Sequence, residues 1–427
     1  MPIVERRFAF LYAVLLMIFC LYGISLTVIG ATLPRILSDF GWNYGGVGLV
    51  MAAGSIANFV AAYLAGRLVR PLGPKASLAA GVALVAAALA VFAATPSLLL
   101  NALVYAAVGV GQGFLETNVN YVVVRIDRSG RAMNLAHAGF SVGAVVGPFV
   151  IGFLLEAGLP WTIVYRAIAA IFVLVLAAVL ALPLGRLLGR EEAPAGKERR
   201  RRGPAYYLGF AALFLYVGVE LGISNWVAEF FVRVFGSSEA AGSFMVSLFW
   251  LGLLAGRLVI PLAFPAARPD RILVILSAAL ALSAGLLAAC GLAGPPAAPV
   301  AAVATALAGL ACSGIYPIVV TLLGRAFPEA QGEAIGFAGT GGGMGAFFFV
   351  FAMSRIAKSG GLELGFAFYA LVAALVAVAS VALAQAVRRA IAARGYAARG
   401  YAARILAEAG STPPRIEGSA GGAGSAP

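Results

Sequence analysis

The stretch AGRLVRPL at residues 65–72 returns almost unchanged as AGRLVIPL at residues 255–262. Each copy closes a long apolar run, and the copies occupy corresponding places in the two halves of the chain. Two further matches keep the same order, namely GIS at 23–25 and 222–224, and GFSVGAVVG at 139–147 against GFAGTGGGMG at 336–345. Short matches arise easily in sequence rich in glycine and alanine, but three of them in register indicate a duplicated chain.

The composition around these repeats is that of a membrane protein. The 427 residues are 62% hydrophobic and 11% charged, whereas soluble domains contain about 25% charged residues. A helix needs roughly 20 apolar residues to cross a bilayer. Twelve such runs are predicted, at 8–33, 45–69, 75–94, 98–124, 132–156, 161–184, 205–230, 239–263, 270–292, 297–325, 331–356 and 362–386.

The repeats and the runs together predict an all-α membrane protein with twelve transmembrane helices in two pseudo-symmetric six-helix bundles. The charged stretch GRLLGREEAPAGKERRRRGP separates the bundles. The predicted parts are an N-terminal bundle at 1–184, a basic cytoplasmic linker at 185–204, a C-terminal bundle at 205–387 and a partly disordered cytoplasmic tail at 388–427. In duplicated transporters of this kind the substrate site lies between the halves, near the middle of the membrane.

The net charge of +13 is explained by topology. With the N-terminus inside, most of the 30 lysines and arginines fall on the inner side, including Arg67 and Arg257 near the ends of their spans. This distribution follows the positive-inside rule. It predicts a multi-pass protein of the cytoplasmic (inner) membrane with both termini in the cytoplasm, and it makes nucleic-acid binding unnecessary as an explanation of the charge.

Two acidic residues, Glu116 and Glu220, lie inside predicted spans, whereas the others map to loops, tails or span ends. Charged residues inside a membrane are costly and mark functional sites by default. A low-dielectric environment favours the neutral form of a carboxyl group, so a carboxyl group that changes its environment can carry a proton. We therefore predict that Glu116 and Glu220 couple transport to protons, with a hydrogen-bonded link between helices as the alternative role for each.

Polar side chains in the same spans are candidates for substrate binding. Asn120 lies four residues after Glu116 and shares its helix face, whereas Asn118 points elsewhere. His137 is the only histidine and stands on the same helix as Asn134. Asn225 and Trp226 follow GIS, where a break in the helix is expected. The full predicted substrate-binding set is Asn120, Asn134, His137, Ser25, Thr27, Asn58, Asn225, Trp226, Tyr316 and Thr340, which suits a polyhydroxylated solute.

The architecture and the loop GRLVRPLGPK at 66–75 resemble the major facilitator superfamily. That loop carries Val69 where the family usually has an acidic residue. GFLETNVN at 113–120 and MNLAHAGFSVGAVVG at 133–147 resemble the fucose permease branch, and YVGVE at 216–220 and SGIYPIVVTL at 313–322 resemble it more thinly. This resemblance implies proton-coupled sugar import, with Glu116 at the proton-carrying position and His137 in the place of a substrate-binding glutamine.

The chain departs from that branch in its first span, where Gly30 stands in place of an acidic residue. Glu220 and Trp226 around GIS are similar to related glucose transporters. The coupling ion is predicted to be a proton in preference to sodium, and fucose itself is not indicated.

The function predicted from the sequence is secondary active uptake of a monosaccharide by alternating access, by a monomer in the lipid bilayer. The alternatives are proton-driven efflux of drugs or metabolites, for which Gly143, Gly147, Pro148 and Gly152 approximate an antiporter pattern, and transport of another small polar solute. No nucleotide loop, metal cluster or catalytic triad is recognisable, so neither an enzyme nor a cofactor is predicted. Cys20, Cys290 and Cys312 all lie inside spans and are interpreted as packing residues.

Overall fold

The computed structural model describes residues 4–126, 131–182, 184, 202–264 and 266–410, and these residues form helices and no strands. The N-terminal half contains α1 (Ala9–Phe40), α2 (Tyr44–Leu72), α3 (Pro74–Val91), α4 (Leu98–Ile126), α5 (Arg131–Glu156) and α6 (Trp161–Ala181). The C-terminal half contains α8 (Pro204–Phe235), α9 (Glu239–Ala263), α10 (Pro269–Ala293), α11 (Ala298–Cys312), α12 (Ile315–Ala326) and α13 (Gln331–Gly410). Most of the predicted linker, and residues 411–427 of the predicted tail, lie outside the described residues.

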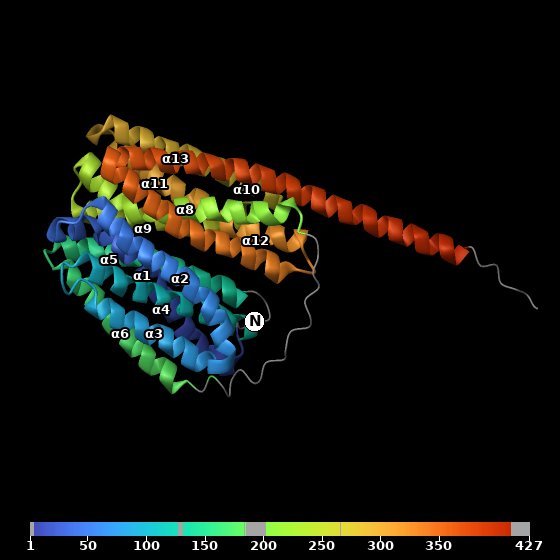
Figure 1. Ribbon diagram of the computed structural model, residues 1–427, viewed down its shortest axis with the longest axis horizontal. Coiled ribbons are helices and arrows are strands. Elements are labelled where there is room, and N and C mark those ends of the chain that lie inside the picture. The colour runs from blue at the N-terminus through green and yellow to red at the C-terminus, as the bar shows by residue number, and fades with distance from the viewer. Residues whose placement is uncertain (1–3, 127–130, 183, 185–201, 265, 411–427) are drawn as a thin grey trace, which may run out of the picture.

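The described residues contain 11 elements long and apolar enough to cross a membrane, and the last of them is two helices in one. Gly361 interrupts α13 with φ 83° and ψ 168°, a backbone conformation that side chains disfavour. The two arms run antiparallel (Figure 1), because Met353 contacts Gly365 and the Tyr369 hydroxyl bonds the carbonyl of Phe349 at 3.5 Å. Counted as two arms, α13 supplies the eleventh and twelfth predicted spans and carries the helix onward to Gly410.

Helices pair in the same way in both halves, through glycines. In each half the first helix crosses the fifth at close range: a Cβ on Gly143 would lie 1.9 Å from the Cys20 carbonyl oxygen, and one on Gly345 would lie 1.9 Å from that of Phe214. The second helix likewise crosses the fourth, with Gly109 against the Gly54 backbone and Gly309 against the Phe249 backbone. Small residues let membrane helices approach closely, and the sequence repeat therefore appears as a repeat of helix crossings.

The structure differs from the sequence prediction in the continuity of two helices. The span 297–325 is interrupted at Ser313 and Gly314, so that α11 and α12 are separate helices. In contrast, α8 continues without interruption past GIS, so no helix break precedes Asn225. In α8, the serine and isoleucine of GIS are tolerated inside the helix. In the other span, the Ser313 amide bonds the carbonyl of Leu310, three residues back, so regular α-helical hydrogen bonding has already ended before Gly314.

The two ends of the bundle differ in how the halves meet. We call the end at which α1 begins and α13 finishes the proximal end, and the opposite end the distal end (Figure 1). Near the distal end the Tyr44 hydroxyl donates to Glu229 Oε1 at 3.0 Å, and Arg35 pairs with Glu239 at 3.4 Å. Both contacts join the two halves, which meet again along α5 and α9.

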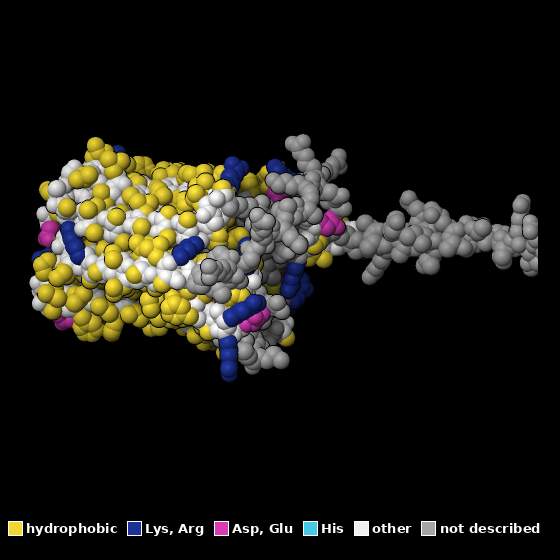
Figure 2. Space-filling model, turned by 90° about the horizontal axis from the view of Figure 1, so that it is seen from below, with side chains coloured by type: hydrophobic (Ala, Val, Ile, Leu, Met, Phe, Trp, Pro, Cys, Tyr) yellow, Lys and Arg dark blue, Asp and Glu magenta, His cyan; other side chains and the backbone are white. Residues whose placement is uncertain are grey.

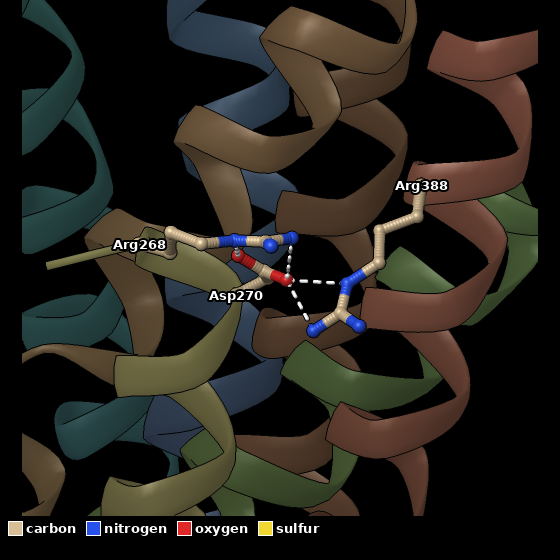
Figure 3. A network of polar contacts seen from close by, with 3 residues as sticks. All are labelled: Arg268, Asp270 and Arg388. Atoms are coloured by element: carbon tan, nitrogen blue, oxygen red, sulfur yellow. Dashed lines mark hydrogen bonds and ion pairs between the residues drawn. The ribbon is translucent and has the colours of Figure 1, made fainter.

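The surface of the bundle fits a bilayer. Apolar side chains cover the flank of the described helices, and most lysines and arginines visible on this face gather toward the proximal end (Figure 2). At that end Asp270, on the first turn of α10, receives hydrogen bonds from Arg268 and from Arg388 on the second arm of α13 (Figure 3). The two arginines thereby attach the beginning of α10 to the second arm of α13.

Candidate functional site

A cavity of about 550 Å³ lies between the two halves. Its walls come from α1, α2 and α4 on one side and from α8, α12 and the first arm of α13 on the other. Lining residues toward the distal end, such as Ile29 and Met51, are buried, whereas Tyr63 and Gly336, nearer the proximal end, are exposed. The cavity is therefore accessible from the proximal end and closed from the distal end.

Glu116 projects into this cavity from α4. Its position is ten residues before the end of α4, roughly 15 Å from that end at the helical rise of about 1.5 Å per residue. The Tyr22 hydroxyl of α1 donates to Glu116 Oε2 at 3.0 Å. This hydrogen bond stabilises the carboxylate, so the site contains a protonatable group with one fixed donor.

Amide and hydroxyl groups surround Glu116. Asn120 lines the cavity one turn further along α4, as its spacing predicts, and its buried Oδ1 atom has no hydrogen-bond partner among the residues that the structure describes. A buried acceptor without a partner is costly, so this oxygen is available to a donor in the cavity. The other predicted residues that line the cavity are Asn58, Asn225, Tyr316 and Thr340. Asn118, by contrast, points away and donates to Ser77 Oγ at 2.9 Å.

The cavity also contains polar residues that the sequence did not single out, namely Tyr22, Ser55, Tyr63, Tyr105, Gln112 and Thr117. Gln112 stands one turn before Glu116 and donates to Ser25 Oγ at 3.0 Å. Its spacing of four residues from Glu116 was the signal that could have identified it. Tyr22 and Tyr105 could not be identified in this way, because their role depends on how α1 and α4 are rotated against their neighbours.

Several predicted residues lie outside the cavity lining. Ser25 is buried and supports Gln112, whereas the Thr27 hydroxyl bonds the carbonyl of Gly23 at 3.0 Å. Trp226 is completely buried against Tyr44. The His137 ring packs on Phe19, with 5.3 Å between ring centroids. The side chain of Asn134 lies outside the described part of the structure.

Glu220 belongs to a second polar cluster, outside the cavity lining. It is 9% exposed and lies within electrostatic range of Arg257 on α9. Arg257 Nη1 donates to Ser141 Oγ of α5 at 2.9 Å and so reaches from one half to the other. The sequence placed Arg257 at the inner side with the other basic residues, whereas its side chain extends into the bundle. The one sequence feature that marked Arg257 was its place in the repeat, in which Arg67 is its counterpart. In the structure, Arg67 lies over the Tyr63 ring.

Glu229 is another buried acidic residue, which the sequence assigned to the end of a span. It is 0% exposed, and its Oε1 atom accepts from both Tyr44 and Arg233 at 3.0 Å. Within the described part of the chain, its buried Oε2 atom has no hydrogen-bond partner. Because Tyr44 belongs to α2 and Glu229 to α8, this contact holds the two halves together on the distal side of the cavity.

These features, two six-helix halves around a central polar cavity that is accessible from one end, define a membrane transporter. The sequence profile described as the Major Facilitator Superfamily matches residues 15–297. The chain belongs to this superfamily and is a multi-pass transporter of small molecules.

Two bacterial transporters are similar to the chain in sequence. An uncharacterized MFS-type transporter of Yersinia pestis is 27% identical over 375 residues, covering 85% of this chain and 93% of the relative. The glucose/mannose transporter GlcP of Bacillus subtilis is 25% identical over 280 residues, covering 61% of this chain and 67% of the relative.

Solved structures share the fold. A D-xylose-proton symporter superposes with a TM-score of 0.71 at 14% sequence identity, covering 86% of this chain and 96% of the symporter. FucP, captured in the outward conformation, gives a TM-score of 0.57 at 20% identity, covering 88% of this chain and 99% of FucP. The predicted family resemblance and the all-helical fold class are confirmed, and both resemblances to solved structures concern the fold alone.

Proposed function

We propose that this protein is a secondary transporter that takes up a monosaccharide together with a proton. The observation that carries the proposal is the placement of Glu116: a carboxyl group inside the central cavity, hydrogen-bonded to Tyr22 and facing amides from both halves. The glucose/mannose transporter among the relatives supports a sugar as the solute.

The lining suits a neutral polyhydroxylated solute. Asn58 and Asn120 of the N-terminal half and Asn225 of the C-terminal half each offer a donor and an acceptor. Tyr22 and Tyr316 add phenols that can bond hydroxyl groups and cover the apolar face of a sugar ring. The cavity volume of about 550 Å³ lies within the range of small-molecule sites, roughly 300–1,000 Å³.

The transport cycle follows from the two ends of the cavity. We place the basic proximal end on the cytoplasmic side of a bacterial inner membrane. In this orientation the structure is the inward-facing state of a monomeric carrier. Closing the proximal end and opening the distal contacts of Tyr44 and Arg35 would expose the same cavity to the outside. Protonation of Glu116 removes a charge that is costly to carry through the closed state, and loss of this proton to the cytoplasm resets the carrier.

Uptake into proteoliposomes tests this proposal. D-glucose, D-mannose, D-xylose and L-fucose are offered under an imposed proton gradient and then under a sodium gradient. We expect accumulation of at least one sugar with the proton gradient alone. Glu116→Gln should still exchange the sugar across the membrane without concentrating it, because a neutral side chain can neither take up nor release the coupling proton.

Exposed Glu156 at the distal end of α5 provides the matched control, and Glu156→Gln should accumulate sugar as the wild type does. Undiminished accumulation by Glu116→Gln would exclude the coupling role. Extrusion of hydrophobic cations without transport of any sugar would favour efflux in place of sugar uptake.

A further inference from the structure

Gly30 is a glycine in the interior of α1 to which the proposed cycle gives no role. Glycine is less favourable than alanine inside a helix, so its presence there needs a reason. A Cβ atom on Gly30 would lie 2.7 Å from the Ser224 carbonyl oxygen and 3.0 Å from the Asn225 Cα atom, both in the backbone of α8. Because α1 and α8 belong to opposite halves, the missing side chain lets the two halves touch backbone to backbone.

This contact lies at the distal limit of the cavity. Both α1 and α8 run from the proximal toward the distal end (Figure 1). On α1 the cavity lining extends as far as Ile29, and on α8 it extends as far as Asn225. The contact of Gly30 is therefore made at the level where the lining of both helices ends, and parting the two helices there would extend the cavity toward the distal end.

The α8 backbone that Gly30 contacts cannot give way by itself. It belongs to an uninterrupted helix, and the Ser224 hydroxyl accepts a hydrogen bond from Trp250 Nε1 of α9 at 2.8 Å. A side chain on Gly30 must therefore push α1 and α8 apart as whole helices. Because Asn225 lines the cavity, the same contact also determines how closely its amide approaches α1.

A second pair of helices from opposite halves repeats this arrangement. A Cβ atom on Gly48 of α2 would overlap the Oγ and Cβ atoms of Ser354, on the first arm of α13. The Cβ atom of Ser354 is fixed by the backbone, so a change of rotamer does not relieve the overlap. Gly48 lies three residues beyond Met51, where the lining of α2 ends toward the distal end. Both contacts between the halves are thus made by glycines of the N-terminal half, on the distal side of the lining.

Gly23 differs from Gly30 although it stands on the same helix, seven residues earlier. A Cβ atom on Gly23 would overlap the Phe140 carbonyl oxygen of α5, which belongs to the same half as α1. In alternating access each half moves largely as a rigid body, so the α1–α5 crossing is kept whichever end is open. A side chain at Gly23 is therefore unfavourable in every state, whereas one at Gly30 is unfavourable only when the distal end is closed.

We propose that Gly30 and Gly48 are positioning residues of the transport cycle, whose missing side chains permit the distal-closed state and so set its balance with the distal-open state. A side chain at either position disfavours the closed state and leaves the open state unaffected. The proposal rests on the proposed function only in its alternating access, and it holds whichever solute and ion are moved.

Spin labels at Ala157 and Ser359, exposed distal positions in opposite halves, measure distal opening in the purified protein without any solute. The free-energy cost of overpacking one methyl group against fixed atoms corresponds to about tenfold in an equilibrium constant. We therefore expect Gly30→Ala and Gly48→Ala each to raise the ratio of distal-open to distal-closed molecules by about tenfold. Each should also lower the Tm less than Gly23→Ala does, because opening relieves the overlap.

Gly23→Ala is the matched control, and it should lower the Tm without changing the distances. If Gly30→Ala and Gly48→Ala keep the distances of the wild type, the glycines do not set the balance and the proposal is wrong. If Gly23→Ala opens the distal end equally, the effect is a general loosening and the proposal is also wrong. Should Gly30→Ala fail to fold, Gly48→Ala decides by the same measurement.

The proposed function is checked separately in the same proteins by D-glucose counterflow in proteoliposomes. Absence of counterflow in the wild type would count against D-glucose as the solute, while the distance measurement would still decide on the two glycines.

Discussion

At the scale of single residues, the carboxyl group of Glu116 is controlled by one neighbour from another helix. The hydroxyl of Tyr22 reaches it from α1, and the Tyr22 ring packs on Phe140 of α5, with 5.2 Å between centroids. A change in how α1 and α5 sit against α4 must therefore alter the hydrogen bond to Glu116. This contact links the protonation of the cavity to the arrangement of the surrounding helices.

Replacing Tyr22 by phenylalanine removes the hydroxyl that donates to Glu116 and that also hydrogen-bonds Asn58, and it keeps the aromatic ring in the cavity wall. A hydrogen bond donated to a carboxylate favours its charged form, so without it the bound proton is released less readily. We expect Tyr22→Phe to retain sugar exchange while its accumulation requires a more alkaline interior than in the wild type. Uptake measured at a series of internal pH values gives this shift. Tyr207→Phe, at an exposed tyrosine, should leave the pH profile in place, and an unchanged profile in Tyr22→Phe would contradict the role of the hydroxyl.

How far these residues could be predicted depends on whether their signal lies within one helix. Glu116 and Asn120 were predictable, because a buried charge is conspicuous in an apolar run and a spacing of four residues puts both on one face. Ser25 and Thr27 show the limit of this reasoning: both are polar and central, yet α1 turns them toward neighbouring helices. Arg257 and Glu229 were missed because depth alone does not reveal the direction of a long side chain or a contact between halves.

At the scale of elements, helix crossings without side chains between them fix the shape of each half. The sequence predicted the twelve runs, since apolar length is a local property, but not the break after Ser313 or the continuity of α8. Those depend on the neighbours of each backbone segment. The repeated crossings of first on fifth and second on fourth helices were implied by the repeat, and the glycines that allow them became identifiable only with the helices in place.

Gly143 is the sharpest test of these crossings. An alanine Cβ there would lie 1.9 Å from the Cys20 carbonyl oxygen, a backbone atom that cannot move independently of α1. Overpacking of this kind costs about 1–3 kcal/mol, so Gly143→Ala should lower the Tm of the purified protein. Gly139→Ala, one turn away on α5, has 3.5 Å to its nearest neighbour and should unfold at or above the temperature of the wild type. Equal Tm values for the two variants would show that α1 and α5 are less closely packed than described.

At the scale of the whole molecule, closure of the distal end and access from the proximal end are two aspects of one arrangement. The contacts that Tyr44, Ser243 and Ser247 make across the halves all involve the distal parts of α2 and α9. The cavity lining becomes exposed only toward the other end. None of this was predictable from sequence, because the same helices in the same order are compatible with either end being open. The choice depends on the balance of contacts between halves.

The contact from Tyr44 to Glu229 allows a prediction about the balance of contacts between the two halves. Glu229 is fully buried, and the Tyr44 hydroxyl is its partner from the other half. A hydrogen bond to a charged group contributes about 1.5–3 kcal/mol, and 1.4 kcal/mol corresponds to about tenfold in an equilibrium constant. Tyr44→Phe should therefore raise the ratio of distal-open to distal-closed molecules by about tenfold. Spin labels at Ala157 and Ser359, exposed distal positions in opposite halves, report this as a larger population of long distances. Trp42→Phe removes a distal hydrogen bond to Pro96 within one half and should leave the distances unchanged; the same population in all three proteins would mean that the Tyr44 hydroxyl does not hold the distal end closed.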